Sequence, residues 1–332
     1  MKSTILLRIT NAIAARADCL RPPHNNAFRL FNGFTEGAKE FTVDVYGKTL
    51  VIHDYRSEAP ARADELPDAI AELLLERISF TEAIIYKRRK GRTADERNGI
   101  LLRGDTPDTR IVEDDVQYAL AMTLNRDAGF YIDTRGVRRW ILDHMLGKTV
   151  LNTFAYTGSL GIAAMAANAK EVIQTDLNRV FLNVAKQSCA MNGFPVIKRN
   201  FVTGDFFMVM KQFTRQERTF DCVILDPPFF STTAGGRVDL ENNMTRLINK
   251  IRPLVKNGGN IIAINNAVYL PGKEYINTLN DLCSDSYVSI ESTIPVPKDC
   301  AGYPQTVVEQ PFIDPSPFNH STKIVVLKIT HK

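Results

Sequence analysis

Residues 149–160, TVLNTFAYTGSL, constrain the fold of this chain more than any other stretch. The first three suit a buried strand, a turn that contains Gly158 follows, and a helical pattern begins near Leu160. A strand, a tight turn with glycine and a helix are how α/β proteins place backbone N–H groups against a ligand at the carboxyl edge of a sheet. Such a turn is also an ordinary α/β connection, so the segments downstream of it must decide between a ligand site and a plain connection.

Three acidic residues follow consecutive predicted strands. They are Asp176 after a buried strand at residues 171–176, Asp205 after a short strand near 200–203, and Asp226 after an apolar strand at 220–225. In a doubly wound sheet all three lie at the carboxyl edge, where ligands bind. Each one alone could instead be a helix N-cap. Their joint order behind the glycine turn favours a ligand site.

The order of these motifs resembles that of a known family. FAYTGSLG, QTDLN, GDFF and LDPPFFS follow one another as in class I S-adenosylmethionine-dependent methyltransferases. The segments NRDAGFYIDTRGVRRW, at residues 125–140, and LFNGFTEGAKEFTVDVYG resemble the branch that contains large-subunit ribosomal RNA methyltransferases, including cytosine-C5 enzymes. The resemblance implies an α/β fold with a doubly wound, Rossmann-like sheet of seven strands. It also implies S-adenosyl-L-methionine as cofactor and RNA methylation in rRNA processing.

The length of 332 residues favours two domains. We expect a smaller N-terminal α+β domain at residues 1–108 and the methyltransferase domain at 109–332. The predicted parts of the smaller domain are strands at 41–46 and 50–55 around a turn, a helix at 66–78, a strand at 83–86 and an exposed loop at 91–97. For this domain, substrate docking and a structural cap both stay open. The proline-rich residues 295–320 are interpreted as a lid or substrate wall.

The resemblance also assigns a cofactor site. Tyr131 would cover the cofactor, Asp133 would pair with its ammonium group and Arg135 with its carboxylate. Asp176 would hold the ribose hydroxyls, and Asp205 would accept from the adenine amino group. The other predicted cofactor-binding residues are Phe154, Ala155, Tyr156 and Gly158 in the turn, Leu177 and Asn178 after the second strand, and Phe206, which would stack beside the adenine.

Asp226, Pro227, Pro228 and Phe229 form the predicted target site. In N-methyltransferases with this motif, the carboxylate and a proline carbonyl accept hydrogen bonds from an amine, while the aromatic ring stacks on an extruded base. Cytosine-C5 enzymes need a thiolate and usually carry Lys after the prolines, where this chain has Phe229. We therefore predict methylation of a base nitrogen in RNA, in particular ribosomal RNA, through this motif. One alternative is a C5 enzyme that uses Cys300 or another thiol, and a second is a protein or small-molecule methyltransferase. An NAD-linked oxidoreductase fits only the turn, because GxGxxG is absent.

Composition places the chain among globular proteins, with 44% hydrophobic and 23% charged residues. No apolar run is long enough to cross a membrane, the N-terminus lacks the pattern of a signal peptide, and no metal site is visible. The cysteines, at positions 19, 189, 222, 283 and 300, form no CxxC pair, so we expect reduced thiols and a cytoplasmic protein. The net charge of +4 is mild, but basic runs at 87–92 and 135–139 would suit RNA phosphates as well as a solvated surface. Oligomeric state stays open.

Overall fold

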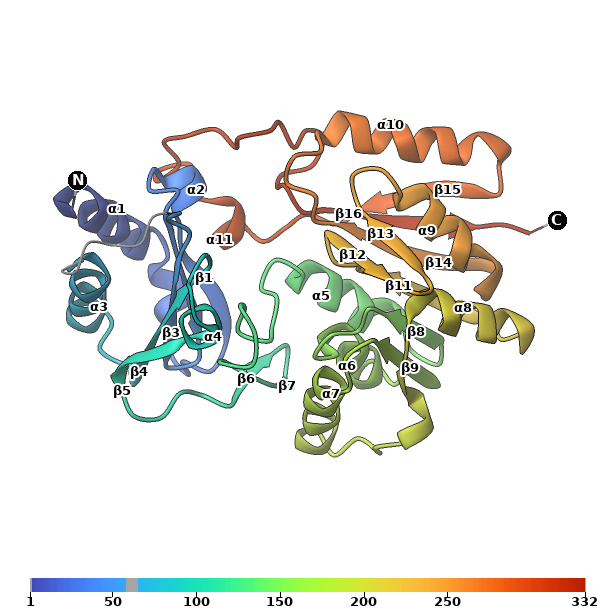
Figure 1. Cartoon of the computed structure of the whole chain (residues 1–332), viewed down its shortest axis with the longest axis horizontal. Coiled ribbons are helices and arrows are strands. Elements are labelled where there is room, and N and C mark those ends of the chain that lie inside the picture. Colours follow the sequence, from blue (N-terminus) through green and yellow to red (C-terminus); the bar gives the residue numbers. More distant parts are fainter. Residues whose placement is uncertain (1, 58–64, 332) are drawn as a thin grey trace. The chain divides into compact units, whose positions relative to one another are not determined.

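The computed structural model describes residues 2–57 and 65–331, which fold into two compact units (Figure 1). The first unit comprises Met1–Ile132 with Pro297–Pro311, and the second comprises Asp133–Val296 with Phe312–Lys332. This division differs from the expected boundary between residues 108 and 109. Residues 109–132 belong to the first unit, and so does the segment Pro297–Pro311 from the C-terminal half of the chain. Among the described residues, no helix is both long and apolar enough to cross a bilayer.

The first unit is built on a five-stranded sheet with the strand order β1-β2-β3-β4-β5. Its elements are α1 (Lys2–Ala15), η1 (Ala17–Leu20), β1 (Ala27–Asn32), α2 (Gly33–Glu36), β2 (Phe41–Tyr46), β3 (Thr49–Asp54), α3 (Leu66–Arg77), β4 (Ala83–Arg88), α4 (Ala94–Asn98), β5 (Ile100–Gly104), β6 (Arg110–Glu113), β7 (Val116–Ala119) and α11 (Lys298–Ala301). Apolar side chains of α1 and α3 pack on alternate residues of β1, β2 and β3. The hairpin and the helix at 66–78 are confirmed. The expected loop at 91–97 contains most of α4 and leads into β5, which the sequence analysis missed.

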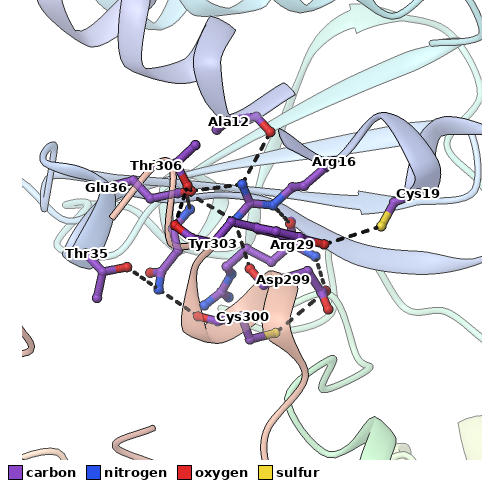
Figure 2. A network of polar contacts seen from close by, with 11 residues as sticks. Ala12, Arg16, Cys19, Arg29, Thr35, Glu36, Asp299, Cys300, Tyr303 and Thr306 are labelled. Atoms are coloured by element: carbon purple, nitrogen blue, oxygen red, sulfur yellow. Dashed lines mark hydrogen bonds and ion pairs between the residues drawn. The ribbon is translucent and has the colours of Figure 1, made fainter. Parts of the chain in front are cut away.

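A buried ion pair explains why residues 297–311 belong to the first unit (Figure 2). Arg16 in this pair is fully buried, and its guanidinium lies 2.9 Å from the Glu36 carboxylate. The same guanidinium donates to the Asp299 carbonyl at 3.0 Å, and the Arg29 amide donates to the Asp299 carboxylate at 2.9 Å. Thr306 also donates to Glu36. A buried ion pair needs such additional hydrogen-bond partners, so residues 297–311 are part of the core of this unit.

The second unit carries a seven-stranded sheet with the order β10-β9-β8-β11-β14-β16-β15. Its elements are α5 (Arg135–His144), β8 (Thr149–Thr153), α6 (Ser159–Ala166), β9 (Glu171–Asp176), α7 (Arg179–Met191), η2 (Lys198–Asn200), β10 (Phe201–Thr203), α8 (Phe206–Arg215), β11 (Phe220–Leu225), β12 (Phe230–Thr233), β13 (Gly236–Asp239), α9 (Met244–Ile251), η3 (Arg252–Leu254), β14 (Val255–Asn265), α10 (Gly272–Leu282), η4 (Cys283–Asp285), β15 (Val288–Thr293) and β16 (Lys323–Ile329). The first five strands of this order are parallel, and β16 is antiparallel to both of its neighbours. This is the predicted seven-stranded, Rossmann-like sheet.

The strand order reverses at β8, which pairs with β9 on one side and β11 on the other. Right-handed crossovers in opposite directions place helices on both faces of such a sheet. The side chains of α8, α9 and α10 share one apolar core with β11, β14 and β16. The carboxyl ends of β8, β9, β10 and β11 meet at one edge, where ligands bind in doubly wound folds.

A short hairpin of β12 and β13 follows the end of β11, and the sequence analysis did not predict it. Its strands pair from Phe230 with Asp239 to Thr233 with Gly236. The dipeptide Gly235-Gly236 between two alternating segments was the available signal, because glycine permits the tight turns of hairpins. The hairpin matters because it begins directly behind the predicted target motif.

Candidate cofactor and target-base site

The turn after β8 has a strained backbone. Phe154 and Tyr156 both have positive φ, at 50° and 52°, and Gly158 follows at 82°. Left-handed backbone is costly for bulky side chains and persists where the surroundings impose it. Here the Ala155 amide donates to the Thr175 carbonyl at 2.8 Å, and the Tyr156 amide donates to the Asp176 carboxylate at 2.8 Å. The predicted cofactor turn is therefore held in shape by the end of β9.

Gly158 is required by packing as well as by its φ value. A Cβ at this position would lie 2.5 Å from the Ala185 Cβ and 2.5 Å from the Gln174 Oε1. Helix α6 therefore starts in close contact with β9 and α7. Its first N–H groups point toward the carboxyl edge of the sheet.

Asp176 ends β9 as predicted, and its carboxylate is partly engaged. One oxygen accepts from the Tyr156 amide and the other from the Asn178 amide, each at 2.8 Å. Burial raises the pKa of Asp176, while these backbone donors oppose the rise. A carboxylate has about four acceptor positions, so it can also accept from ribose hydroxyls. Leu177 beside it is 62% exposed, which leaves its side chain open for adenine. The Asn178 side chain caps α7.

Asp205 is the N-cap of α8, as the alternative interpretation of these aspartates allowed. Its carboxylate accepts from the Met208 amide at 3.1 Å and from the Thr233 hydroxyl of the β12–β13 hairpin. Any adenine amino group would share this carboxylate with the hairpin. Phe206 is only 7% exposed and stacks on Phe154 with 4.5 Å between the ring centroids. Its ring therefore lies in the core, and its stacking beside adenine stays a prediction.

Residues 131–135 span the division between the two units. Tyr131 lies in the first unit, is 46% exposed, and donates to the Asp127 carboxylate at 3.1 Å. Asp133 opens the second unit and accepts from the Thr322 hydroxyl at 2.8 Å. Arg135 begins α5 and is partly buried. The structure thus places Asp133 and Arg135 in the unit that carries the glycine turn.

Asp226 lies just beyond the carboxyl end of β11. Burial raises its pKa to about 7, and the charge of Asp133 adds to the rise. Among the described residues, none donates a hydrogen bond to the Asp226 side chain. Pro227 is buried, whereas Phe229 is 43% exposed. The motif therefore presents a carboxyl group with open acceptor positions next to an accessible aromatic ring.

The thiols of the second unit do not gather at the carboxyl edge of its sheet. Cys300 is 1% exposed and lies in the first unit, where its carbonyl accepts from Asn32 at 2.7 Å. Burial raises the pKa of Cys222 to about 12 and that of Cys189 to about 11. Cys283 precedes β15, which runs parallel to β14, so it lies at the amino edge. None of the three cysteines of the second unit is placed as a nucleophile beside Asp226, and Cys300 is buried within the first unit, so the cytosine-C5 alternative gains no support.

Two side chains of the basic run at 87–92, Lys87 and Arg88, are buried, whereas Lys90 and Arg92 are exposed. Lys87 is fully buried and donates to the carbonyls of Asn98, Asn125 and Asp127 at 2.6 to 2.8 Å. Burial lowers its pKa to about 8. Arg88 is 7% exposed, and in the second run Arg138 is buried against the Thr134 hydroxyl. The sequence left phosphate contact and a solvated surface open for both runs, and neither applies to these three side chains, because they fill interior positions.

Comparison with known proteins identifies the family of this chain. A family model described as S-adenosylmethionine-dependent methyltransferase matches residues 84–294. Ribosomal RNA large subunit methyltransferase I of Vibrio cholerae is 31% identical over 233 residues, and that of Aeromonas salmonicida is 29% identical over 233 residues. In both cases the match covers 68% of this chain and 57% of the relative. The chain thus spans little more than half the length of these curated relatives.

Solved structures show the same fold. The crystal structure of SMU.776 complexed with SAH has a TM-score of 0.84 at 21% identity, covering 99% of this chain and 82% of that one. The tRNA m1G37 methyltransferase of M. jannaschii has a TM-score of 0.57 at 15% identity, covering 98% and 79%. With the family match over more than half of the sequence, the chain belongs to the S-adenosylmethionine-dependent methyltransferases, and its cofactor is S-adenosylmethionine.

Proposed function

We propose that the second unit binds S-adenosylmethionine at the carboxyl ends of β8, β9, β10 and β11 and methylates a base nitrogen of RNA, in particular ribosomal RNA. The observation that carries this proposal is Asp226, a carboxyl group with open acceptor positions beside the accessible ring of Phe229.

The residues present fit the cofactor. Asp133 and Asp226 are close enough for the charge of one to raise the pKa of the other. A cation between them would relieve this repulsion, and S-adenosylmethionine carries both an ammonium group and a positive sulfur. Asp176 would hold the ribose, and the exposed Leu177 would cover the adenine. When bound, the cofactor supplies an electrophilic methyl group.

Asp226 can then orient and deprotonate the acceptor. Its carboxylate accepts a hydrogen bond from an N–H of the base, while Phe229 stacks on the extruded ring. As the nitrogen–carbon bond forms and the sulfur–carbon bond breaks, the nitrogen proton passes to Asp226. A carboxyl group with a pKa near 7 is suited to act as a base at neutral pH. Methylation of cytosine C5 would require a thiolate nucleophile instead.

The relatives support RNA as the substrate class. The two relatives reported above are ribosomal RNA large subunit methyltransferases, and one solved structure of the same fold is a tRNA m1G37 methyltransferase. Because the chain covers 57% of the ribosomal relatives, the substrate of this chain needs its own test.

The test is methyl transfer from labelled S-adenosylmethionine to total RNA and ribosomal particles from a strain that lacks the protein, followed by nucleoside mass spectrometry. We expect the label on a ring or exocyclic nitrogen. Asp226→Asn should lower kcat by about 100-fold or more at saturating cofactor, since a positioned base contributes about that much. The cofactor should still bind, with lower affinity, because one of the two carboxylates beside its cation is lost. Asp143→Asn, at an exposed position of α5, is the matched control and should be unaffected.

Other outcomes point elsewhere. A label on cytosine C5 would favour the thiolate alternative, and full turnover by Asp226→Asn would remove that residue from the mechanism. If RNA takes no label although the cofactor binds, proteins and small molecules become the acceptors to test.

A further inference from the structure

The β12–β13 hairpin carries an exposed aromatic and cationic pair that the proposed methyl transfer does not use. Phe230 is 53% exposed, and the guanidinium carbon of Arg237 lies 4.9 Å from the centre of its ring. The Arg237 side chain is 57% exposed and is also held by the Asp239 carboxylate at 2.7 Å. One exposed apolar side chain needs no explanation, but Phe230 directly follows the exposed Phe229, and adjacent exposed aromatic residues mark interaction sites.

The hairpin is fixed to the rest of the second unit at several points. Thr233 donates to the Asp205 carboxylate at the start of α8. A Cβ at Gly235 would lie 1.9 Å from the Asp205 Oδ1, so the tip of the hairpin rests directly on this helix cap. At its base, the Leu240 amide donates to the Phe229 carbonyl at 3.1 Å. The exposed pair is therefore held rigidly, and a rigid aromatic surface binds with little loss of conformational entropy.

The position of Phe230 relates the pair to the target motif. It directly follows Phe229, the residue that would stack on the target base, and both rings are about half exposed. Successive bases of single-stranded RNA stack on aromatic side chains and on arginine planes. A guanidinium that is already stacked and paired keeps its planar orientation. This chemistry fits a nucleobase better than an apolar protein segment, because a cation lies in the middle of the apolar surface.

On the basis of the proposed RNA methyltransferase function, we propose that Phe230 and Arg237 form a stacking platform for a nucleotide that flanks the target base. The platform binds RNA and selects unpaired substrate. It takes no part in the chemical step, so its loss should affect KM for RNA and leave kcat and cofactor affinity unchanged.

The experiment compares Phe230→Ala, Phe230→Tyr, Arg237→Gln and Arg237→Lys with the wild type. It measures methyl transfer to ribosomal RNA and anisotropy of a fluorescent, mixed-sequence single-stranded RNA of about 15 nucleotides. Matched controls come from the amino edge of the sheet, opposite the ligand edge. They are Leu146→Ala, which is 72% exposed before β8, and Arg215→Gln at the exposed end of α8.

We expect Phe230→Ala to raise KM and the RNA dissociation constant about fivefold or more, the weight of one stacked base, and Phe230→Tyr to restore both. Arg237→Lys should resemble Arg237→Gln, because lysine keeps the positive charge but lacks the planar guanidinium on which a base could stack. If lysine instead restores binding fully and glutamine lowers the salt dependence, Arg237 is a phosphate contact and the platform is refuted. The platform is also refuted if both Phe230→Ala and Arg237→Gln behave like the controls.

Failure of the proposed function gives a different result. In that case the wild type itself transfers no methyl group to RNA and does not bind the labelled RNA, and the platform is rejected along with it. Methylation by the wild type with unchanged variants rejects only the platform.

Discussion

Replacing Asp226 with Asn should stabilise the protein in the absence of cofactor, and the gain should depend on pH. Burial and the charge of Asp133 raise the pKa of Asp226 from 3.8 to about 7. The folded state therefore binds this proton more tightly than the unfolded state. Its contribution to stability is present below the unfolded pKa near 4 and is lost as pH rises through about 7. Asparagine mimics the neutral form at every pH.

The size of the effect follows from the same displacement. Each pKa unit corresponds to about 1.4 kcal/mol, so the shift in the pKa of Asp226 gives a maximum stability difference of about 4 kcal/mol. Asp226 is only partly buried by accessible surface, and solvent screening reduces the figure to about 1 to 3 kcal/mol.

Urea unfolding at pH 4.5 and pH 8.5, followed by circular dichroism without cofactor, measures this difference. The free energy of unfolding of Asp226→Asn should exceed that of the wild type at pH 8.5, and by a much smaller amount at pH 4.5. The assigned environment of this carboxyl group would be refuted if the variant were less stable than the wild type at pH 8.5. It would also be refuted if the difference in unfolding free energy were the same at both pH values.

Two further predictions concern the frame around the site. Arg16→Met leaves the buried Glu36 carboxylate without its cation, and Glu36→Gln leaves the buried Arg16 guanidinium without its anion. Each variant should lower the free energy of unfolding in urea by about 3 to 5 kcal/mol. The double variant should recover part of this loss, and Arg21→Met, which removes an exposed ion pair, should change little; equal effects of Arg16 and Arg21 would contradict the role of the network. Gly158→Ala should weaken S-adenosylmethionine binding by about tenfold or more, a change of about 1.4 kcal/mol, because its Cβ has no room. Gly193→Ala shares the positive φ but meets nothing within 4 Å, so calorimetry should show unchanged cofactor affinity for that variant.

The sheet of the second unit could be predicted because local patterns and long-range order agree there. Each predicted strand is an apolar run, and each predicted acidic residue follows one of these strands. Parallel strands must place their carboxyl ends at one edge. The positions of Asp176, Asp205 and Asp226 therefore follow from the sequence alone.

Other features depend on contacts that no local pattern encodes. Pro297–Pro311 joins the first unit because Arg16 and Arg29, far away in sequence, bind Asp299. The basic run at 87–92 looks like a solvated surface, yet Lys87 is buried because loop carbonyls converge on its ammonium group. The charge of a residue in the sequence does not reveal whether its side chain is buried or which groups it contacts.

Two aspartates at opposite ends of β11 differ in how their carboxylates are paired. Asp221 lies at the amino end of β11, and although burial acts to raise its pKa, the Lys256 ammonium at 2.8 Å and both donors of Thr149 hold it at about 2. Asp226 lies just beyond the other end of the same strand, where burial acts without any donor from the described residues. A fold selected only for stability would supply a cation there as it does for Asp221. The open carboxyl group at the ligand edge supports the proposed mechanism, in which its partners are the bound substrate and cofactor.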